Sequence, residues 1–212
     1  MPTTATVITP LRFAQGLTWA DFLAGVAVNR DRFERNYNSP VLTGDDLAFF
    51  RKASNLQNGP KKMLVIAEAW CGDVYRELPT AVRIAQAAGM ELRIFLRDEN
   101  PDIMDEFLSN EGRSRAIPVF IFYTADTHYI THFTERSASA HAGLAQAVEQ
   151  AKAKLNLPAS ATFGSLQGQE KQAFLGELIP LIEPHADQWR KDAIGEMREL
   201  FAKALNIEGA AA

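Results

Sequence analysis

The sequence predicts an α/β protein built on a central mixed sheet with helices on both faces. Three observations lead to this fold class. An uninterrupted apolar run at residues 62–67 is typical of a strand buried on both faces of a sheet. Strand and helix patterns alternate after it, and two further strand patterns joined by a short turn close the series.

The predicted sheet and its helices occupy residues 62–155. They are, in order, a strand at 62–67, a helix from 73 or 74 to 88, a strand at 91–96, a helix opening at Pro101, strands at 118–123 and 127–133, and a helix at 137–155. Gly89 is placed to end the first of these helices, because glycine readily takes the left-handed backbone of a helix terminus. Residues 124–126 supply the turn of a hairpin.

Helical extensions are predicted on both sides of this core. Thr18 with Asp21, and Thr43 with Asp46, have the spacing of capping boxes, so we expect helices over 18–35 and from Thr43 to near residue 58. Residues 36–40 form a turn between them. After a loop at 158–168, helical patterns run over 169–182, break at Glu183-Pro184 and end in an apolar stripe from Trp189 to Leu205. We therefore divide the chain into an N-terminal helical extension (1–60), a core (61–156) and a C-terminal helical extension packed on it (157–212), as a single globular unit.

Composition excludes several classes of function. The 212 residues are 47% apolar and 23% charged with a net charge of −4, which leaves no basic footprint for nucleic acid. No apolar run approaches the ~20 residues that span a bilayer, so we expect no membrane association. The start of the chain has no basic segment followed by an apolar one, and we expect a cytoplasmic protein.

One cysteine occurs in the sequence, and its position suggests chemistry. Cys71 follows the apolar strand in the turn Trp70-Cys71-Gly72 and precedes a predicted helix. The first amides of a helix carry partial positive charge and favour a thiolate. A lone thiol also excludes an internal disulfide and fits a reducing compartment.

This region resembles the thioredoxin fold. The apolar strand runs into Trp70-Cys71-Gly72, Pro79 lies eight residues after Cys71 within the helix, and Ile117-Pro118 precedes an aromatic strand that opens the hairpin. The runs at 70–73, 96–100 and 114–122 are similar to those of bacterial thioredoxin family proteins with a single-cysteine Trp-Cys-Gly-Asp motif. The resemblance implies a thioredoxin-like fold, a cis bond before Pro118 and a substrate groove beside it.

Two substitutions within the resemblance narrow the chemistry that it implies. Val74 occupies the place of the resolving cysteine, and Val65 the place of the buried aspartate that moves protons during resolution. We therefore predict a single-cysteine thiol-disulfide oxidoreductase whose mixed disulfide is resolved by an external thiol. Its partners would be a small-molecule thiol or a protein disulfide, and no cofactor or metal is required.

The resemblance also implies the site residues. Cys71 is the nucleophile, and the substrate-binding residues are Trp70, Gly72, Asp73, Arg115, Ile117 and Pro118. Asp73 opposes formation of the Cys71 thiolate by charge repulsion, whereas Arg115 offsets Asp73 if the proline loop packs against the cysteine. The sign of this balance stays open at the level of sequence.

Other functions remain alternatives. The same groove would serve a non-catalytic thioredoxin-like binding module in which Cys71 is an inert buried thiol. Peroxide reduction ranks lower, because Glu68 stands where the peroxidase branch of the fold has a threonine.

His128 and His132 are interpreted as surface residues, since no cysteine or carboxylate joins them in a metal site. The sequence does not specify an oligomeric state.

Overall fold

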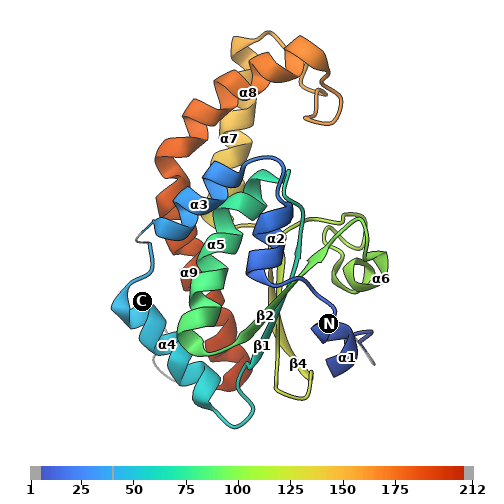
Figure 1. Cartoon of the computed structure of the whole chain (residues 1–212). Helices are drawn as coiled ribbons and strands as arrows, with labels where there is room; N and C mark the ends of the chain where they lie inside the picture. Colours follow the sequence, from blue (N-terminus) through green and yellow to red (C-terminus); the bar gives the residue numbers. More distant parts are fainter. Residues whose placement is uncertain (1–5, 40, 208–212) are drawn as a thin grey trace. The chain divides into compact units, whose positions relative to one another are not determined.

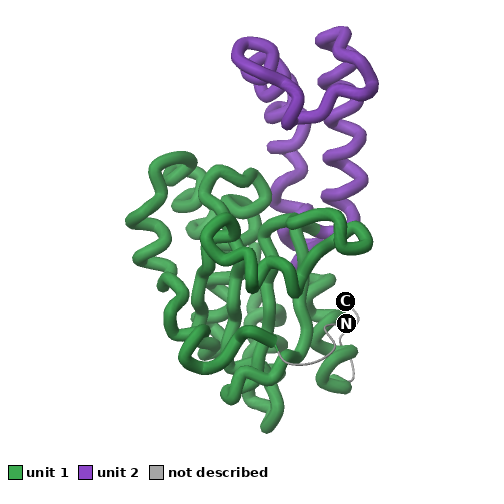
Figure 2. The backbone as a smooth tube through the Cα atoms, turned by 90° about the vertical axis from the view of Figure 1, so that its right-hand side faces the viewer, with its two compact units in different colours: residues 1–136, 194–212 green, residues 137–193 purple. Residues whose placement is uncertain are grey.

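A computed structural model describes residues 6–39 and 41–207 (Figure 1). Its elements are α1 (Pro10–Ala14), α2 (Trp19–Gly25), α3 (Arg30–Asn38), α4 (Gly44–Asn55), β1 (Lys62–Ala67), α5 (Gly72–Ala88), β2 (Glu91–Leu96), α6 (Pro101–Met104), η1 (Asp105–Phe107), β3 (Val119–Tyr123), β4 (Tyr129–Thr134), α7 (Ala138–Lys154), α8 (Gly168–Ile182), η2 (Glu183–His185) and α9 (Ala186–Leu205). Figure 2 colours two compact units, one of residues 1–136 and 194–212 and the other of residues 137–193.

The first unit contains a four-stranded mixed sheet in the order β2-β1-β3-β4. β1 runs parallel to β2, with Ala67 opposite Leu96, and antiparallel to β3, with Ile66 opposite Val119. The end of β1 therefore lies beside the start of β3. This register brings the turn after β1 next to the loop that precedes β3, although about fifty residues separate them in sequence.

Helices cover both faces of this sheet, as predicted. Phe122 in β3 packs edge-to-face on Phe201 of α9, with ring centroids 4.6 Å apart. On the other face, Phe107 in η1 packs on His132 of β4, with ring centroids 5.3 Å apart. Side chains of a strand alternate between faces, so the apolar residues of β3, all buried, serve both layers.

Helix α5 has the predicted extent, and its two ends show why. Cys71 is its N-cap residue with an extended backbone, and Gly89 ends it at φ 67°, where its amide donates to the carbonyls of Ala85 and Gln86. Pro79 lies inside the helix and has no amide hydrogen, so the carbonyl of Tyr75, four residues earlier, loses its usual donor. The side-chain amide of Asn36 donates to that carbonyl instead, at 2.7 Å.

The N-terminal extension differs from its prediction in two ways. The single helix expected over 18–35 is wrong: α2 ends at Gly25, and α3 begins after Asn29, whose φ of 63° breaks the helical path. The turn expected at 36–40 begins later, because α3 continues to Asn38, and Pro40 lies outside the described residues. Both predicted capping boxes, at Thr18 and Thr43, are present.

Two short features near the N-terminus were not predicted. Helix α1 begins where the Thr9 hydroxyl accepts from the Arg12 amide, with Pro10 in its first turn. Leu17 exchanges two backbone hydrogen bonds with Ile94, each 2.8 Å long. This bridge covers part of the exposed edge of β2.

Several core boundaries also differ from expectation by a few residues. The helix opening at Pro101 is only four residues long and tightens into the 3₁₀ turn η1. Strand β4 begins at Tyr129 rather than at residue 127, because Thr127 takes a left-handed backbone (φ 62°) in the hairpin turn. The strands β1, β2 and β3 match their predicted ranges to within a residue.

The second unit is helical. Ser137 caps α7 by accepting from the Ala140 amide, and its hydroxyl donates to the carbonyl of Trp189. Gly143 allows the close approach of the Trp189 ring, since a β-carbon there would lie 2.5 Å from a ring atom. Its core residues are Ala140, Ala147, Ala151, Ala161, Leu166, Phe174, Leu178, Ile182 and Trp189.

The structure divides the chain at other positions than the three sequence-based segments do, and that three-part division stays a prediction. Its outer ends, residues 1–5 and 208–212, lie outside the described residues.

Within the described residues, no helix is both long and apolar enough to cross a bilayer.

Candidate functional site

Cys71 sits where β1 passes into α5. The strand ends at Ala67, and a tight turn follows in which the Cys71 amide donates to the carbonyl of Glu68 at 3.1 Å. The side chain of Cys71 is half-buried. A short turn between a central strand and a helix thus positions the thiol at the helix start and keeps part of it accessible.

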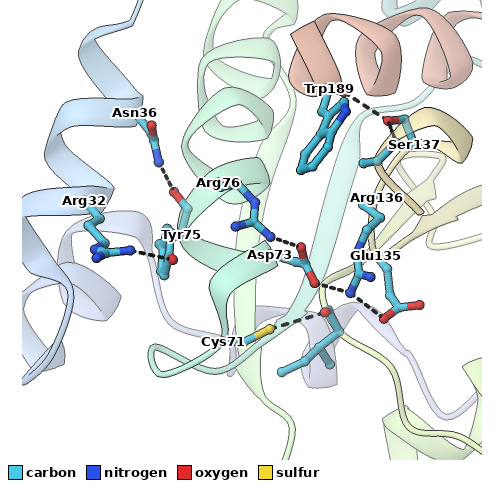
Figure 3. Close-up of polar contacts among 12 residues, drawn as sticks. Arg32, Asn36, Cys71, Asp73, Tyr75, Arg76, Glu135, Arg136, Ser137 and Trp189 are labelled. Carbon is cyan, nitrogen blue, oxygen red and sulfur yellow. Dashed lines mark hydrogen bonds and ion pairs between the residues drawn. The ribbon is translucent and has the colours of Figure 1, made fainter. Parts of the chain in front are cut away.

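The loop before β3 lies against this thiol. The Ile117-Pro118 peptide bond is cis, as the resemblance implied. The Cys71 thiol donates to the carbonyl oxygen of Ile117 at 3.5 Å (Figure 3). Both loop residues are buried. The sequence-predicted Cys71, Ile117 and Pro118 are therefore brought together.

The surroundings of Cys71 raise the pKa of its thiol, a direction that the sequence left open. Burial raises the pKa of the Cys71 thiol above its ordinary value, and the Asp73 carboxylate raises it further. The backbone amides of Val74 and Asp73 and the Arg76 guanidinium act in the opposite direction but do not outweigh burial. At neutral pH the thiol is therefore mainly protonated.

Asp73 is held in a buried ion-pair network. One carboxylate oxygen pairs with Arg76, three residues along α5, and the other with Arg136, which also pairs with Glu135 at 3.2 Å (Figure 3). The side chains of Asp73, Arg76 and Arg136 are 8%, 11% and 16% exposed. Sequence reasoning missed both arginines; for Arg76, the i, i+3 spacing from Asp73 was the available signal.

The positions for resolving chemistry are apolar. Val74 and Val65 are both fully buried, so neither place offers a thiol or a proton carrier. Glu68 accepts a hydrogen bond from the Asp98 amide at 3.0 Å and joins the turn to the end of β2. The site thus contains one thiol, and the two places where the resemblance implies a resolving cysteine and a buried aspartate hold valines.

Trp70 and Arg115 lie on the outer side of the site. Trp70 is 54% exposed, and the Arg97 guanidinium stacks 5.0 Å from the centre of its ring. Arg115 makes two hydrogen bonds to the Asp105 carboxylate, at 2.9 and 3.0 Å. The Asp73 carboxylate pairs with Arg76 and Arg136 instead, and the substrate-binding role of Arg115 stays a prediction.

Helix α3 also contributes to the site, which the sequence did not suggest. The Asn29 side chain donates to the carbonyl of Ala69 at 3.2 Å, Arg32 to the hydroxyl of Tyr75 at 2.7 Å, and Asn36 to the carbonyl of Tyr75. These three residues follow one another at spacings of three and four, the period of one helix face. This polar stripe was the missed signal.

Replacing Asn36 with alanine is expected to destabilise the protein by about 1 kcal/mol, because the Tyr75 carbonyl then has neither Pro79 nor Asn36 as a donor. Urea denaturation measures this change. Asn38→Ala on the same helix is the matched control: its side chain donates to the exposed carbonyl of Glu34, so we expect little change. Equal effects of the two substitutions would contradict this role for Asn36.

His128 and His132 differ in their surroundings. His132 is half-buried, its Nδ1 lies 2.6 Å from the Tyr129 hydroxyl, and burial lowers its pKa. The expectation of a surface residue is therefore correct for His128, which is exposed, and only partly so for His132. Among the residues with described positions, no group of three metal-binding side chains occurs.

Comparison with known proteins places this geometry in context. The family model described as Thioredoxin (Thioredoxin_9) matches residues 16–152, more than half of the chain. PA1234 from Pseudomonas aeruginosa, a protein of unknown function, is 19% identical with a TM-score of 0.52, covering 84% of this chain and 99% of that one. An HIV epitope-scaffold is 19% identical with a TM-score of 0.55, covering 91% and 96%. Identities this low indicate a shared fold. No curated protein matches the sequence.

Proposed function

Because the chain belongs to the Thioredoxin_9 family of thioredoxin-like proteins, we propose that it carries out single-cysteine thiol-disulfide exchange through Cys71. The observation that carries the proposal is the half-buried Cys71 thiol at the start of α5, 3.5 Å from the carbonyl of Ile117 in the cis-proline loop. In the proposed complex the backbone of Ile117 would pair with an extended substrate, and the exposed Trp70 would supply an apolar wall.

The proposed reaction has two exchange steps. The Cys71 thiolate attacks a substrate disulfide, forms a sulfur–sulfur bond to one half and releases the other half as a thiolate. An external thiolate then attacks the substrate sulfur of the mixed disulfide, and the electron pair of the breaking bond returns to Cys71. The protein ends as it began, and the external thiol becomes part of the new disulfide.

The environment of Cys71 would limit the rates of both exchange steps. The raised pKa leaves little thiolate at neutral pH, which slows attack, and makes Cys71 a poor leaving group, which slows release. Val74 supplies no internal thiol that would shorten the life of the mixed disulfide. We therefore expect a long-lived mixed disulfide.

The partners that we propose are small thiols and protein disulfides. The mechanism requires an external reducing thiol, so we propose a reducing compartment, the cytoplasm, as its location. It requires no metal or cofactor, because a thiolate alone performs both exchanges.

Dithiol and monothiol activity can be separated by two assays on the same protein. With thioredoxin reductase and NADPH as the only reductant, we expect no catalytic reduction of insulin, because one cysteine cannot form the internal disulfide that the reductase would reduce. With excess 2-mercaptoethanol and a cysteine peptide carrying a hydroxyethyl disulfide, we expect release of the peptide thiol above the uncatalysed rate.

Cys71→Ser is the control for both assays. In the assay with 2-mercaptoethanol it should release the peptide thiol only at the uncatalysed rate. Insulin turnover with the reductase alone would contradict the monothiol proposal. So would a second assay in which the unaltered protein and Cys71→Ser behave alike.

The raised pKa favours a second candidate, a non-catalytic binding module that uses the same cis-proline groove. In that case a peptide that binds the protein would do so equally well with Cys71→Ser, and no covalent adduct would form. Peptide binding without an adduct would therefore decide for the binding module.

A further inference from the structure

Hydrogen-bond donors gather beside Gly72, the residue next to the reactive thiol. Arg32 donates to the Tyr75 hydroxyl at 2.7 Å, and the two side chains point toward each other (Figure 3). A β-carbon on Gly72 would lie 3.5 Å from the Tyr75 hydroxyl oxygen and 3.6 and 3.7 Å from the terminal nitrogens of Arg76. We call Arg32, Tyr75 and Arg76 the donor cluster. The backbone of Gly72, one residue from Cys71, therefore lies beside polar atoms of this cluster.

The donor cluster offers hydrogens in excess of acceptors. A guanidinium has five N–H donors and no acceptor, and the Tyr75 oxygen already accepts from Arg32, which leaves its own hydrogen to donate. Asp73 occupies one terminal nitrogen of Arg76, Nη2. A ligand that satisfies the remaining donors must bring acceptor atoms.

The charges around the cluster favour an anion. Arg32 donates to a neutral hydroxyl, whereas the other charged residues of α3 pair with one another, Arg30 with Glu34 and Arg35 with Asp31. Arg32 is therefore the cation of α3 whose charge is not balanced within the helix.

Two carboxylates of α5 act electrostatically on Arg76, and both are buried. Asp73 is held between Arg76 and Arg136, and Glu77 is buried on α5. They reduce the charge at Arg76, whereas Arg32 makes no ion pair with any residue in the described ranges 6–39 and 41–207.

We infer that the donor cluster binds a carboxylate of the molecule that exchanges with Cys71, so that the substrate class is thiols and disulfides with a carboxylate a few bonds from sulfur. This inference rests on the proposed function. A planar carboxylate presents two acceptor oxygens, which match the forked donors of arginine. Arg32 belongs to the N-terminal extension, so this extension would determine specificity.

Three disulfides with the same two-carbon arms test the inference. They are 3,3′-dithiodipropionate, bis(2-hydroxyethyl) disulfide and cystamine, which end in a carboxylate, a hydroxyl and an ammonium group. Intact-mass spectrometry follows formation of the Cys71 adduct at one pH and ionic strength. We expect the carboxylate compound to react about tenfold faster than the hydroxyl compound, since tenfold corresponds to ~1.4 kcal/mol, close to the lower end of the range for one hydrogen bond to a charged group.

The order of rates is diagnostic because simple charge repulsion would reverse it. A thiolate repels a dianionic disulfide, so a small thiol such as 2-mercaptoethanol should react with the carboxylate compound more slowly than with the hydroxyl compound. A faster reaction of the protein with the carboxylate compound would therefore be the reverse of the order that a free thiol gives. Equal rates of the protein with all three disulfides would overturn the inference and leave the proposed function intact.

Variants locate the effect. Arg32→Gln should remove most of the preference for the carboxylate compound, and Tyr75→Phe should reduce it while keeping the ring that packs on Phe33. Arg35→Gln is the matched control: it removes the same charge from an exposed pair on the same helix and should keep the preference. An Arg32→Gln protein with an unchanged rate ratio, folded by circular dichroism, would overturn the inference.

A binding measurement decides the inference independently of thiol chemistry. In the Cys71→Ser protein, 3,3′-dithiodipropionate should shift the NMR amide resonance of Gly72, and Arg32→Gln should abolish the shift. If no disulfide forms an adduct with the unaltered protein, the proposed function fails, and this shift alone supports the carboxylate site. Its absence overturns the site.

Discussion

Replacing Asp73 with asparagine is expected to lower the pKa of the Cys71 thiol and to destabilise the fold at the same time. Burial is the largest cause that raises this pKa, and the Asp73 carboxylate is the second. Asparagine removes the charge of that carboxylate. The change also leaves the guanidiniums of Arg76 and Arg136, 11% and 16% exposed, without the carboxylate between them. Breaking a buried pair of this kind costs about 3–5 kcal/mol.

Two measurements test both halves of this prediction. Thiolate absorbance as a function of pH reports the thiol, and urea denaturation at pH 7 reports the free energy of unfolding. Asp105→Asn is the matched control, because its pair with Arg115 is about half-exposed and contributes under ~1 kcal/mol. A stability loss for Asp73→Asn no greater than for Asp105→Asn, or an unchanged thiol pKa, would show that the network does not act on Cys71 as described.

Alkylation of native Cys71 by iodoacetamide is expected to be about a hundredfold faster at pH 8 than at pH 6. Only the thiolate reacts, and below the pKa of a thiol its fraction rises about tenfold per pH unit. Because burial and Asp73 raise the pKa of Cys71, native protein at pH 7 should react more slowly than urea-denatured protein.

The same shift has a consequence for folding. The native state holds the thiol proton to higher pH than the unfolded chain does. The contribution of this thiol to the free energy of unfolding is therefore complete below its pKa in the unfolded chain and is lost as the pH rises through its pKa in the native protein.

An alkylation rate of native protein that levels off below pH 7 would mean that the thiol is activated rather than suppressed. Cys71→Ser, which has no other cysteine to alkylate, sets the background.

Local sequence patterns were sufficient for most of the core. The apolar run of β1, the left-handed Gly89 at the end of α5 and the two capping boxes are each determined by a few neighbouring residues, and the structure contains all of them. The break between α2 and α3 was missed because Asn29 interrupts an apolar period that otherwise continues to Phe33. Helix α1 has only five residues, too few to show a period.

The site was predictable where a motif carries it and not where distant residues meet. Cys71 and the cis bond before Pro118 followed from the resemblance. Arg136 lies 63 residues from Asp73 in sequence, and no pattern within either segment links them. The sign of the Cys71 pKa shift depends on burial, which only the packed structure provides.

The most direct test of single-cysteine exchange is the capture and release of one mixed disulfide. Native protein is mixed with bis(2-hydroxyethyl) disulfide at pH 8, examined by intact-mass spectrometry, and then treated with an external thiol. We predict one hydroxyethyl adduct, located at Cys71, absent in Cys71→Ser and removed by the thiol. No adduct on native protein, while urea-denatured protein is labelled under the same conditions, would contradict the account.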